Sequence, residues 1–169
     1  MREHVLRSGS PEDTRAIGQK VGALLRAGDV VSLTGELGAG KTCFVQGAAE
    51  ALGVTERVTS PSFILRKDYL GRIPMFHMDV YRLQTLQDVM DIGWDDASDA
   101  QRVAFVEWGD AMSQLLPDQH LEIELRVVED DGFAPGMEPR VIVLRAHGDQ
   151  WLARLEELVT ALAPWEAGG

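Results

Sequence analysis

A glycine-rich stretch at residues 32–44, with the letters SLTGELGAGKTCF, contains the residue types best suited to chemistry. It holds the complete pattern Gly-x4-Gly-Lys-Thr in Gly35, Gly40, Lys41 and Thr42. Glycines let successive backbone N–H groups turn toward phosphate oxygens, because a side chain would clash or forbid the necessary dihedral angles. The pattern therefore predicts a loop that holds the phosphates of a nucleotide.

The motif could be a phosphate loop or only a glycine-rich turn with an exposed lysine, and the predicted elements on either side of it distinguish the two. Residues 29–35 form a short apolar run that predicts a buried strand, and residues 41–52 predict a helix. A phosphate loop needs this order of strand, loop and helix, and the helix N-terminus adds its dipole to the cradle. Lys41 can then span the β- and γ-phosphates as a point charge, and the Thr42 hydroxyl suits a bridging magnesium ion.

Two acidic residues are candidates for the carboxylate that a triphosphatase needs near its metal ion. Asp79 ends the run MFHMD, and Glu107 ends the run VAFVE. Glu107 fits better, since its run is typical of a buried strand whose carboxyl end lies beside the loop in a doubly wound sheet. Asp79 is the second candidate, either on the metal through water or orienting the attacking water. Either acid could instead be an ordinary solvated carboxylate.

Other polar and aromatic residues leave two interpretations open. The segment TSPSF places hydroxyl groups at Thr59, Ser60 and Ser62, which could sense the γ-phosphate or simply cap a turn. Trp108 could stack near the nucleotide or fill the edge of the core. His77 stands among apolar neighbours and is expected to pack rather than to bind a ligand.

The positioning elements alternate between strand and helix along the chain. We expect an α/β fold: a P-loop NTPase-like three-layer domain with a mostly parallel central sheet and added antiparallel strands. One domain should cover residues 1–169, with about 164–169 as a flexible tail. The further elements expected are a helix that starts at Ser10, two extended segments within 58–83, a partly helical segment at 84–101, strands at 102–108, 120–128 and 140–146, and a helix at 149–162.

The composition describes a soluble globular protein, with 45% hydrophobic and 25% charged residues in 169. No uncharged apolar run approaches the roughly 20 residues that span a bilayer, so no membrane association is expected. The first residues do not resemble a signal peptide, and the single cysteine, Cys43, cannot form an internal disulfide. Both observations favour the reducing cytoplasm.

Negative charge is concentrated in one segment of the chain. Residues 88–131 contain thirteen acidic and two basic residues, 2 − 13 = −11, which equals the formal net charge of the whole chain. Nucleic-acid binding needs a basic face, so the chain is a poor candidate for holding RNA alone. This acidic segment could be a solvated surface or a docking face for a basic partner protein.

The motifs in their order along the chain resemble the TsaE family, the ATPase of bacterial tRNA threonylcarbamoyladenosine synthesis. The similar segments are GELGAGKT, VTSPSF, FHMDVYRL, DIGWDD, VEW and LPD. The resemblance implies a small domain that binds ATP and Mg2+, hydrolyses ATP weakly alone and joins the TsaB and TsaD proteins. TsaD would transfer the threonylcarbamoyl group to tRNA beside the anticodon, and ATP hydrolysis would support repeated turnover, so that tRNA is met only through the complex.

The resemblance also assigns roles at matching positions. It implies that Thr42 and Glu107 hold magnesium and that Asp79 and Trp108 belong to the essential site together with Lys41. Arg140 is the equivalent of an arginine that lies near the nucleotide, although the loop before it is longer than usual. Ser62 replaces the usual threonine and keeps the hydroxyl, and Gly109 and Asp110 stand where a proline is common. The nucleotide-binding positions implied are Gly35, Gly38, Ala39, Gly40, Lys41, Thr42 and Arg140.

Two other functions use the same loop. A small-molecule kinase would pass the phosphoryl group to an acceptor, but such enzymes usually add an arginine-rich lid, and the only nearby basic cluster is Arg66, Lys67 and Arg72. A nucleotide-dependent interaction subunit would use ATP as a conformational ligand. Guanine-specific relatives usually carry an Asn-Lys-x-Asp element, which this sequence lacks, so ATP is favoured.

Overall fold

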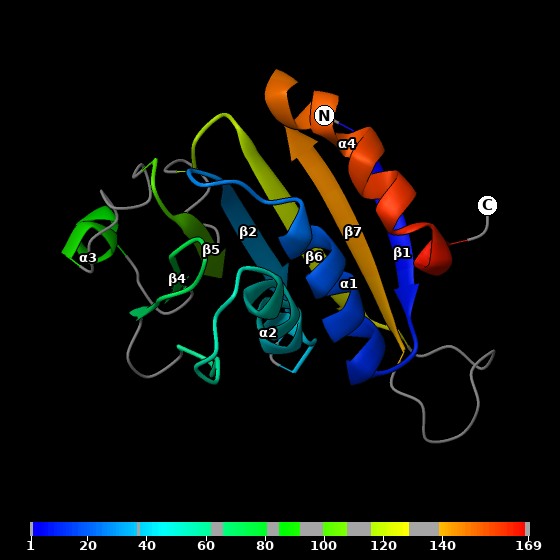
Figure 1. The fold of residues 1–169 in the computed structure, drawn as a ribbon, viewed down its shortest axis with the longest axis horizontal. Coiled ribbons are helices and arrows are strands. Elements are labelled where there is room, and N and C mark those ends of the chain that lie inside the picture. The colour runs from blue at the N-terminus through cyan, green and yellow to red at the C-terminus, as the bar shows by residue number, and fades with distance from the viewer. Residues whose placement is uncertain are drawn as a thin grey trace.

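A mixed seven-stranded sheet forms the centre of the protein in a computed structural model (Figure 1). The structure describes residues 2–36, 38–61, 66–80, 85–91, 100–107, 116–128 and 139–167. The strand order is β1-β7-β6-β2-β5-β4-β3. The strands are β1 (Arg2–Ser8), β2 (Val30–Gly35), β3 (Arg66–Tyr69), β4 (Met75–Asp79), β5 (Val103–Glu107), β6 (His120–Val127) and β7 (Arg140–His147).

The four strands in the middle of the sheet run parallel. β2 pairs with both β5 and β6, and β5 pairs with β4, all in parallel register. β3 joins β4 as an antiparallel hairpin at one edge, and β7 and β1 extend the other side, β7 antiparallel to β6 and β1 antiparallel to β7. Because β2, β4, β5 and β6 share one direction, their carboxyl ends meet at the same edge of the sheet. The start of antiparallel β7 lies at that edge too.

The longer helices cover one face of the sheet, and Figure 1 shows α1, α2 and α4 in front of the strands. The helices are α1 (Pro11–Ala23), α2 (Lys41–Ala51), α3 (Leu86–Asp91) and α4 (Asp149–Ala161), followed by a 3-10 turn, η3 (Ala163–Trp165). α1 begins as the sequence predicts, since the Ser10 side chain accepts a hydrogen bond from the Asp13 N–H at 3.1 Å and Pro11 takes the first helical position.

The apolar core lies between these helices and the sheet. Ile17 and Val21 of α1 and Phe44 of α2 are fully buried there. Side chains of β6 alternate between buried and partly exposed positions, as the sequence of residues 120–128 predicts. The residues that β6 adds to the core are Leu121, Ile123 and Leu125.

The pairing of α1 with α2 depends on glycines at their contact. A Cβ atom at Gly18 would lie 2.2 Å from the Phe44 carbonyl oxygen, and one at Gly47 would lie 2.0 Å from the Arg15 carbonyl oxygen. Real Cβ atoms do not approach backbone so closely, so the two helices can touch only because these side chains are absent. The contact fixes the start of α2, and thereby the end of the glycine-rich loop, against the body of the domain.

The predicted α/β class, the parallel centre and the added antiparallel strands are confirmed. A second helical layer stays a prediction, because the connecting segments 92–99 and 108–115 lie outside the described residues. Sequence patterns did not predict β1, an edge strand with mostly exposed side chains.

Residues 165–167 contact the body of the domain, within the stretch of about 164–169 that the sequence suggests as a flexible tail. Trp165 packs against the core, Glu166 forms a β-bridge with Leu6, and the Ala167 N–H donates to the Val5 carbonyl oxygen at 3.1 Å. Partial burial of a large aromatic side chain here opposes the fraying that is common at chain ends.

Candidate phosphate-binding site

The glycine-rich loop lies where the sequence predicts it, between a strand and a helix. Gly35 is the last residue of β2, and Lys41 is the first residue of α2. Gly40 is the N-cap of α2 with φ at 107°, a conformation that residues with a Cβ rarely adopt. Gly35 is required by packing as well, because a Cβ there would lie 2.5 Å from the Leu125 carbonyl oxygen. Gly35, Gly38 and Gly40 all have positive φ, a conformation that glycine adopts without strain.

Lys41 reaches back across the loop. Its Nζ atom donates a hydrogen bond to the Gly35 carbonyl oxygen at 2.8 Å and lies 3.7 Å from Oε1 of Glu107. The side chain exposes only 11% of its surface, so the ammonium group is held at the loop rather than in solvent. Thr42, the next residue, is half buried in the first turn of α2.

The two predicted acids lie side by side at the carboxyl ends of neighbouring strands. Asp79 on β4 and Glu107 on β5 are partners in the parallel register, and both side chains are buried. A buried carboxylate is costly unless a cation or hydrogen-bond donors compensate its charge. Lys41 supplies part of that compensation for Glu107. The sheet therefore brings together Lys41, Asp79 and Glu107, three residues that are distant in sequence.

His77 is a contact of Glu107 that the sequence did not reveal. As expected, it is fully buried in the core, but its Nε2 lies 3.0 Å from Oε2 of Glu107. The geometry is not that of a hydrogen bond, since the described residues give neither atom a hydrogen-bond partner. The alternation of side chains along β4 could have suggested that His77 lies near the acidic residues, because residues two apart, such as His77 and Asp79, share a face of the sheet.

Arg140 extends to the loop from the start of β7. Its Nε donates to the Ala39 carbonyl oxygen at 3.0 Å, and its Nη2 donates to the Gly38 carbonyl oxygen at 3.1 Å. Both acceptors belong to the glycine-rich loop, so Arg140 contacts it despite the long insertion before β7. Whether Arg140 reaches the nucleotide stays a prediction. Trp108 and Ser62 lie outside the described residues.

A cavity of about 110 Å³ opens on the side of the loop that faces α1. Its walls include Ser10, Pro11, Thr14 and Cys43 in addition to loop residues and Arg140. Ser10 and Pro11 lie beside the loop, although the sequence indicated Ser10 only as the start of a helix. Their place beside the loop is set by the packing of α1 on α2, for which a single element gives no signal.

Comparisons with known proteins find one family. The family model described as "Threonylcarbamoyl adenosine biosynthesis protein TsaE" matches residues 8–132. The tRNA threonylcarbamoyladenosine biosynthesis protein TsaE of Treponema pallidum is 47% identical over 123 residues, which cover 73% of this chain and 91% of the relative. The protein of the same name from Bacillus subtilis is 38% identical over 159 residues, covering 94% and 95%.

A solved structure is similar over nearly the same length. The crystal structure of Bacillus subtilis YdiB has a TM-score of 0.77 at 36% sequence identity and covers 94% of this chain and 95% of its own. Fold, loop and sequence therefore lead to the same assignment. With a family model that matches residues 8–132 and a relative 38% identical over 94% of its length, the chain belongs to the TsaE family.

Proposed function

We propose that this protein is the ATP-binding and ATP-hydrolysing subunit of tRNA threonylcarbamoyladenosine biosynthesis, acting with TsaB and TsaD. The observation that carries the proposal is the position of Lys41 between the glycine-rich loop and the buried carboxylate of Glu107. Family membership supports the pathway, since the relatives carry its name. ATP hydrolysis would support repeated turnover of the complex.

The residues at the loop fit a magnesium ion as well as the triphosphate. Oε2 of Glu107 is a buried oxygen without a hydrogen-bond partner among the described residues, and Thr42 adds a hydroxyl at the end of the loop. Carboxylate and hydroxyl oxygens are ligands that Mg2+ prefers. Thr42 and Glu107 would hold the ion, with Asp79 as a ligand through water or as the group that orients the attacking water. When bound, magnesium would neutralise developing charge on the phosphate oxygens.

Binding of ATP would exchange one set of contacts for another. The first-turn N–H groups of α2 would donate to phosphate oxygens, and the helix dipole would favour their negative charge. Lys41 would turn from the Gly35 carbonyl oxygen and Glu107 toward the β- and γ-phosphates. This movement would leave Glu107 to the metal, so that lysine and carboxylate act only once the nucleotide is present.

The base end of the nucleotide has a candidate position in the cavity beside α1. Ser10, Thr14 and Cys43 offer small polar groups there, and Arg140 borders the same cavity. Arg140 would also keep the loop in its binding shape through the carbonyl oxygens of Gly38 and Ala39. Trp108, which the family resemblance places in the essential site, is proposed to act beside Glu107.

The proposed partners are TsaB and TsaD, and tRNA would be reached only through them. The acidic segment at residues 88–131 remains a candidate docking face for a basic partner protein. Within the described residues, no helix has the length and apolarity that crossing a bilayer requires. We propose the cytoplasm as the compartment.

Reconstitution tests the proposal. The protein would be combined with TsaB, TsaD, tRNA and ATP labelled at the γ-phosphate, and both free phosphate and modified nucleoside would be measured. We expect magnesium-dependent phosphate release and repeated rounds of modification, both lost in Lys41→Ala. Label transferred to a metabolite would instead identify a kinase, and modification without any hydrolysis would identify an interaction subunit.

A further inference from the structure

Three potential metal ligands meet on the sheet face away from α1 and α2. His120 on β6 and His147 on β7 are directly opposite partners in the antiparallel register, and Glu122 follows His120 by two residues on β6. Residues two apart on a strand share a face, and opposite partners have neighbouring Cβ atoms. We call these three residues the His–Glu–His cluster. Each offers one ligand atom, and these atoms lie within 4.8 Å of one another.

We propose that the His–Glu–His cluster binds a divalent transition-metal ion of the zinc class. Two imidazole nitrogens and one carboxylate oxygen form a ligand set typical of zinc sites with three protein ligands and a fourth, open position. Tetrahedral ligands at ordinary zinc distances are roughly 3.4 Å apart, so a pair of ligand atoms as far apart as 4.8 Å would have to approach by up to about 1.4 Å.

The His120 ring is prepared to act as a ligand. Its Nδ1 lies 2.7 Å from the Pro117 carbonyl oxygen, and because a carbonyl can only accept, Nδ1 carries the proton and donates. The lone pair is therefore on Nε2. A backbone carbonyl that accepts from the second ring nitrogen is a usual outer partner of a metal-binding histidine.

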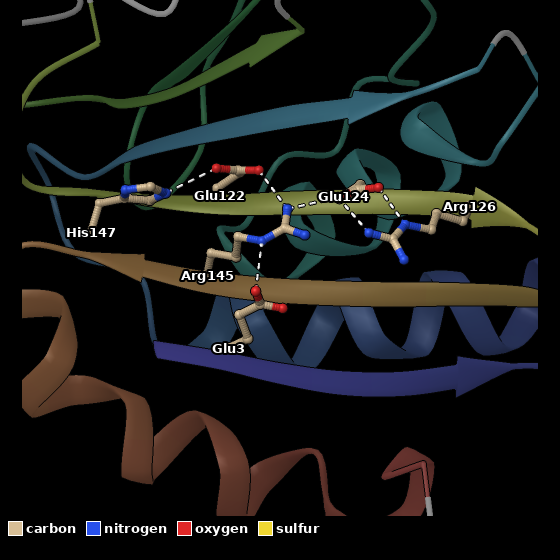
Figure 2. A network of polar contacts seen from close by, with 6 residues as sticks. All are labelled: Glu3, Glu122, Glu124, Arg126, Arg145 and His147. Carbon is tan, nitrogen blue, oxygen red and sulfur yellow. Dashed lines mark hydrogen bonds and ion pairs between the residues drawn. The ribbon is translucent and has the colours of Figure 1, made fainter. Parts of the chain in front are cut away.

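Glu122 is oriented in a similar way by an outer partner. Figure 2 shows Arg145 beside one oxygen of Glu122 and His147 beside the other. Nη1 of Arg145 donates to Oε2 at 2.7 Å, and Nε2 of His147 donates to Oε1 at 2.9 Å. A zinc ion would replace the proton between His147 and Oε1, while Arg145 would keep its hold on Oε2.

One movement is needed before the ion can be bound. The rings of His120 and His147 are stacked, with centroids 4.2 Å apart and planes 8° from parallel, so their in-plane lone pairs do not converge. The His147 side chain is 27% exposed, which leaves its ring room to turn about χ2, a broad torsion in histidine.

The cluster lies far from the phosphate loop. Leu125 on β6 pairs with Gly35 of the loop, and His120 is five residues before Leu125, which is roughly 16 Å along the strand.

Zinc titration of the full-length protein in competition with a chromophoric chelator tests the proposal. We expect one zinc ion per chain, with affinity reduced at least about tenfold in His147→Ala and in Glu122→Gln. Glu124→Gln is the matched control, because Glu124 shares Arg145 but is not in the cluster. Lys41→Ala should bind zinc like the wild type, which separates this site from the phosphate loop and from any failure of the proposed ATPase function.

X-ray absorption of the zinc-loaded wild type gives a second measurement that does not depend on a variant folding. Two nitrogen ligands at about 2.0–2.1 Å and oxygen at about 2.0–2.2 Å are expected. Absence of stoichiometric binding, wild-type zinc affinity in both cluster variants, or sulfur from Cys43 in the coordination shell would overturn the proposal.

Discussion

Lys41 and Glu107 face each other at the glycine-rich loop, with Nζ of the lysine 3.7 Å from Oε1 of the glutamate. The pair joins the first residue of α2 to the last residue of β5. Both side chains are largely buried, so each would be costly without the other. A bound triphosphate would form a stronger ion pair with Lys41, and the Glu107 carboxylate would then be able to bind a cation.

Replacement of the loop lysine should weaken ATP binding. Lys41→Ala removes a charge-assisted contact worth about 1.5–3 kcal/mol, so the dissociation constant should rise roughly 10- to 100-fold. Titration calorimetry measures this. Lys67→Ala is the control, since Lys67 forms a more exposed pair with Glu56. Equal ATP affinity in the wild type and Lys41→Ala would refute the assignment of the loop.

Loss of the glutamate charge should affect turnover more than binding. Glu107→Gln keeps the shape of the side chain but removes the charge proposed to hold magnesium, so we expect at least about a tenfold fall in kcat with a smaller change in ATP affinity. Steady-state phosphate release over a range of magnesium concentrations measures both. Glu56→Gln is the matched control on the exposed pair. Unchanged magnesium-dependent turnover would contradict the role given to Glu107.

Arg140 should matter for the shape of the loop. Arg140→Ala removes two donors to the Gly38 and Ala39 carbonyl oxygens, and we expect ATP affinity to fall about 3- to 30-fold. Arg140→Lys should not restore it, because lysine lacks the planar fork that reaches both oxygens. Arg126→Ala, on an exposed side chain, serves as the control in the same binding assay. Full affinity in Arg140→Ala would rule this role out.

The contact between α1 and α2 should tolerate no added methyl group. Gly47→Ala would place a Cβ 2.0 Å from the Arg15 carbonyl oxygen, and the forced separation of the helices should cost about 1–3 kcal/mol. Chemical denaturation measures the free energy of unfolding. Glu50→Ala, at an exposed position of the same helix, should change it by less than about 0.5 kcal/mol. Equal stability of Gly47→Ala and the wild type would show that the helices can separate freely.

An ion pair that ties α4 to the start of β2 provides a further stability test. Arg154 donates to both oxygens of Asp29, each at 2.8 Å, and to the Leu24 carbonyl oxygen. Both charged side chains are mostly buried. Arg154→Ala would leave Asp29 without this partner, so we expect a loss of about 3 kcal/mol in the free energy of unfolding. Thermal unfolding of Arg154→Ala beside Arg126→Ala measures the difference, and equal melting temperatures would contradict it.

The sequence by itself determined the phosphate loop and most of the local elements. The loop pattern is contained in eight consecutive residues from Gly35 to Thr42, and its chemistry depends on backbone freedom and on one lysine, which are local properties. Helix caps such as Ser10 and alternating runs such as residues 120–128 are also local signals.

Only the tertiary structure decided which distant residues meet. Arg140 reaches Ala39 across 101 positions, and Lys41 meets Glu107 because parallel strands end at a common edge. β1 and the His–Glu–His cluster likewise depend on strand pairing, which sets neighbours by register rather than by spacing along the chain. The physical reason is that hydrogen bonds between strands far apart in the sequence fix which side chains are neighbours in a sheet. A short stretch of sequence does not contain the information on that pairing.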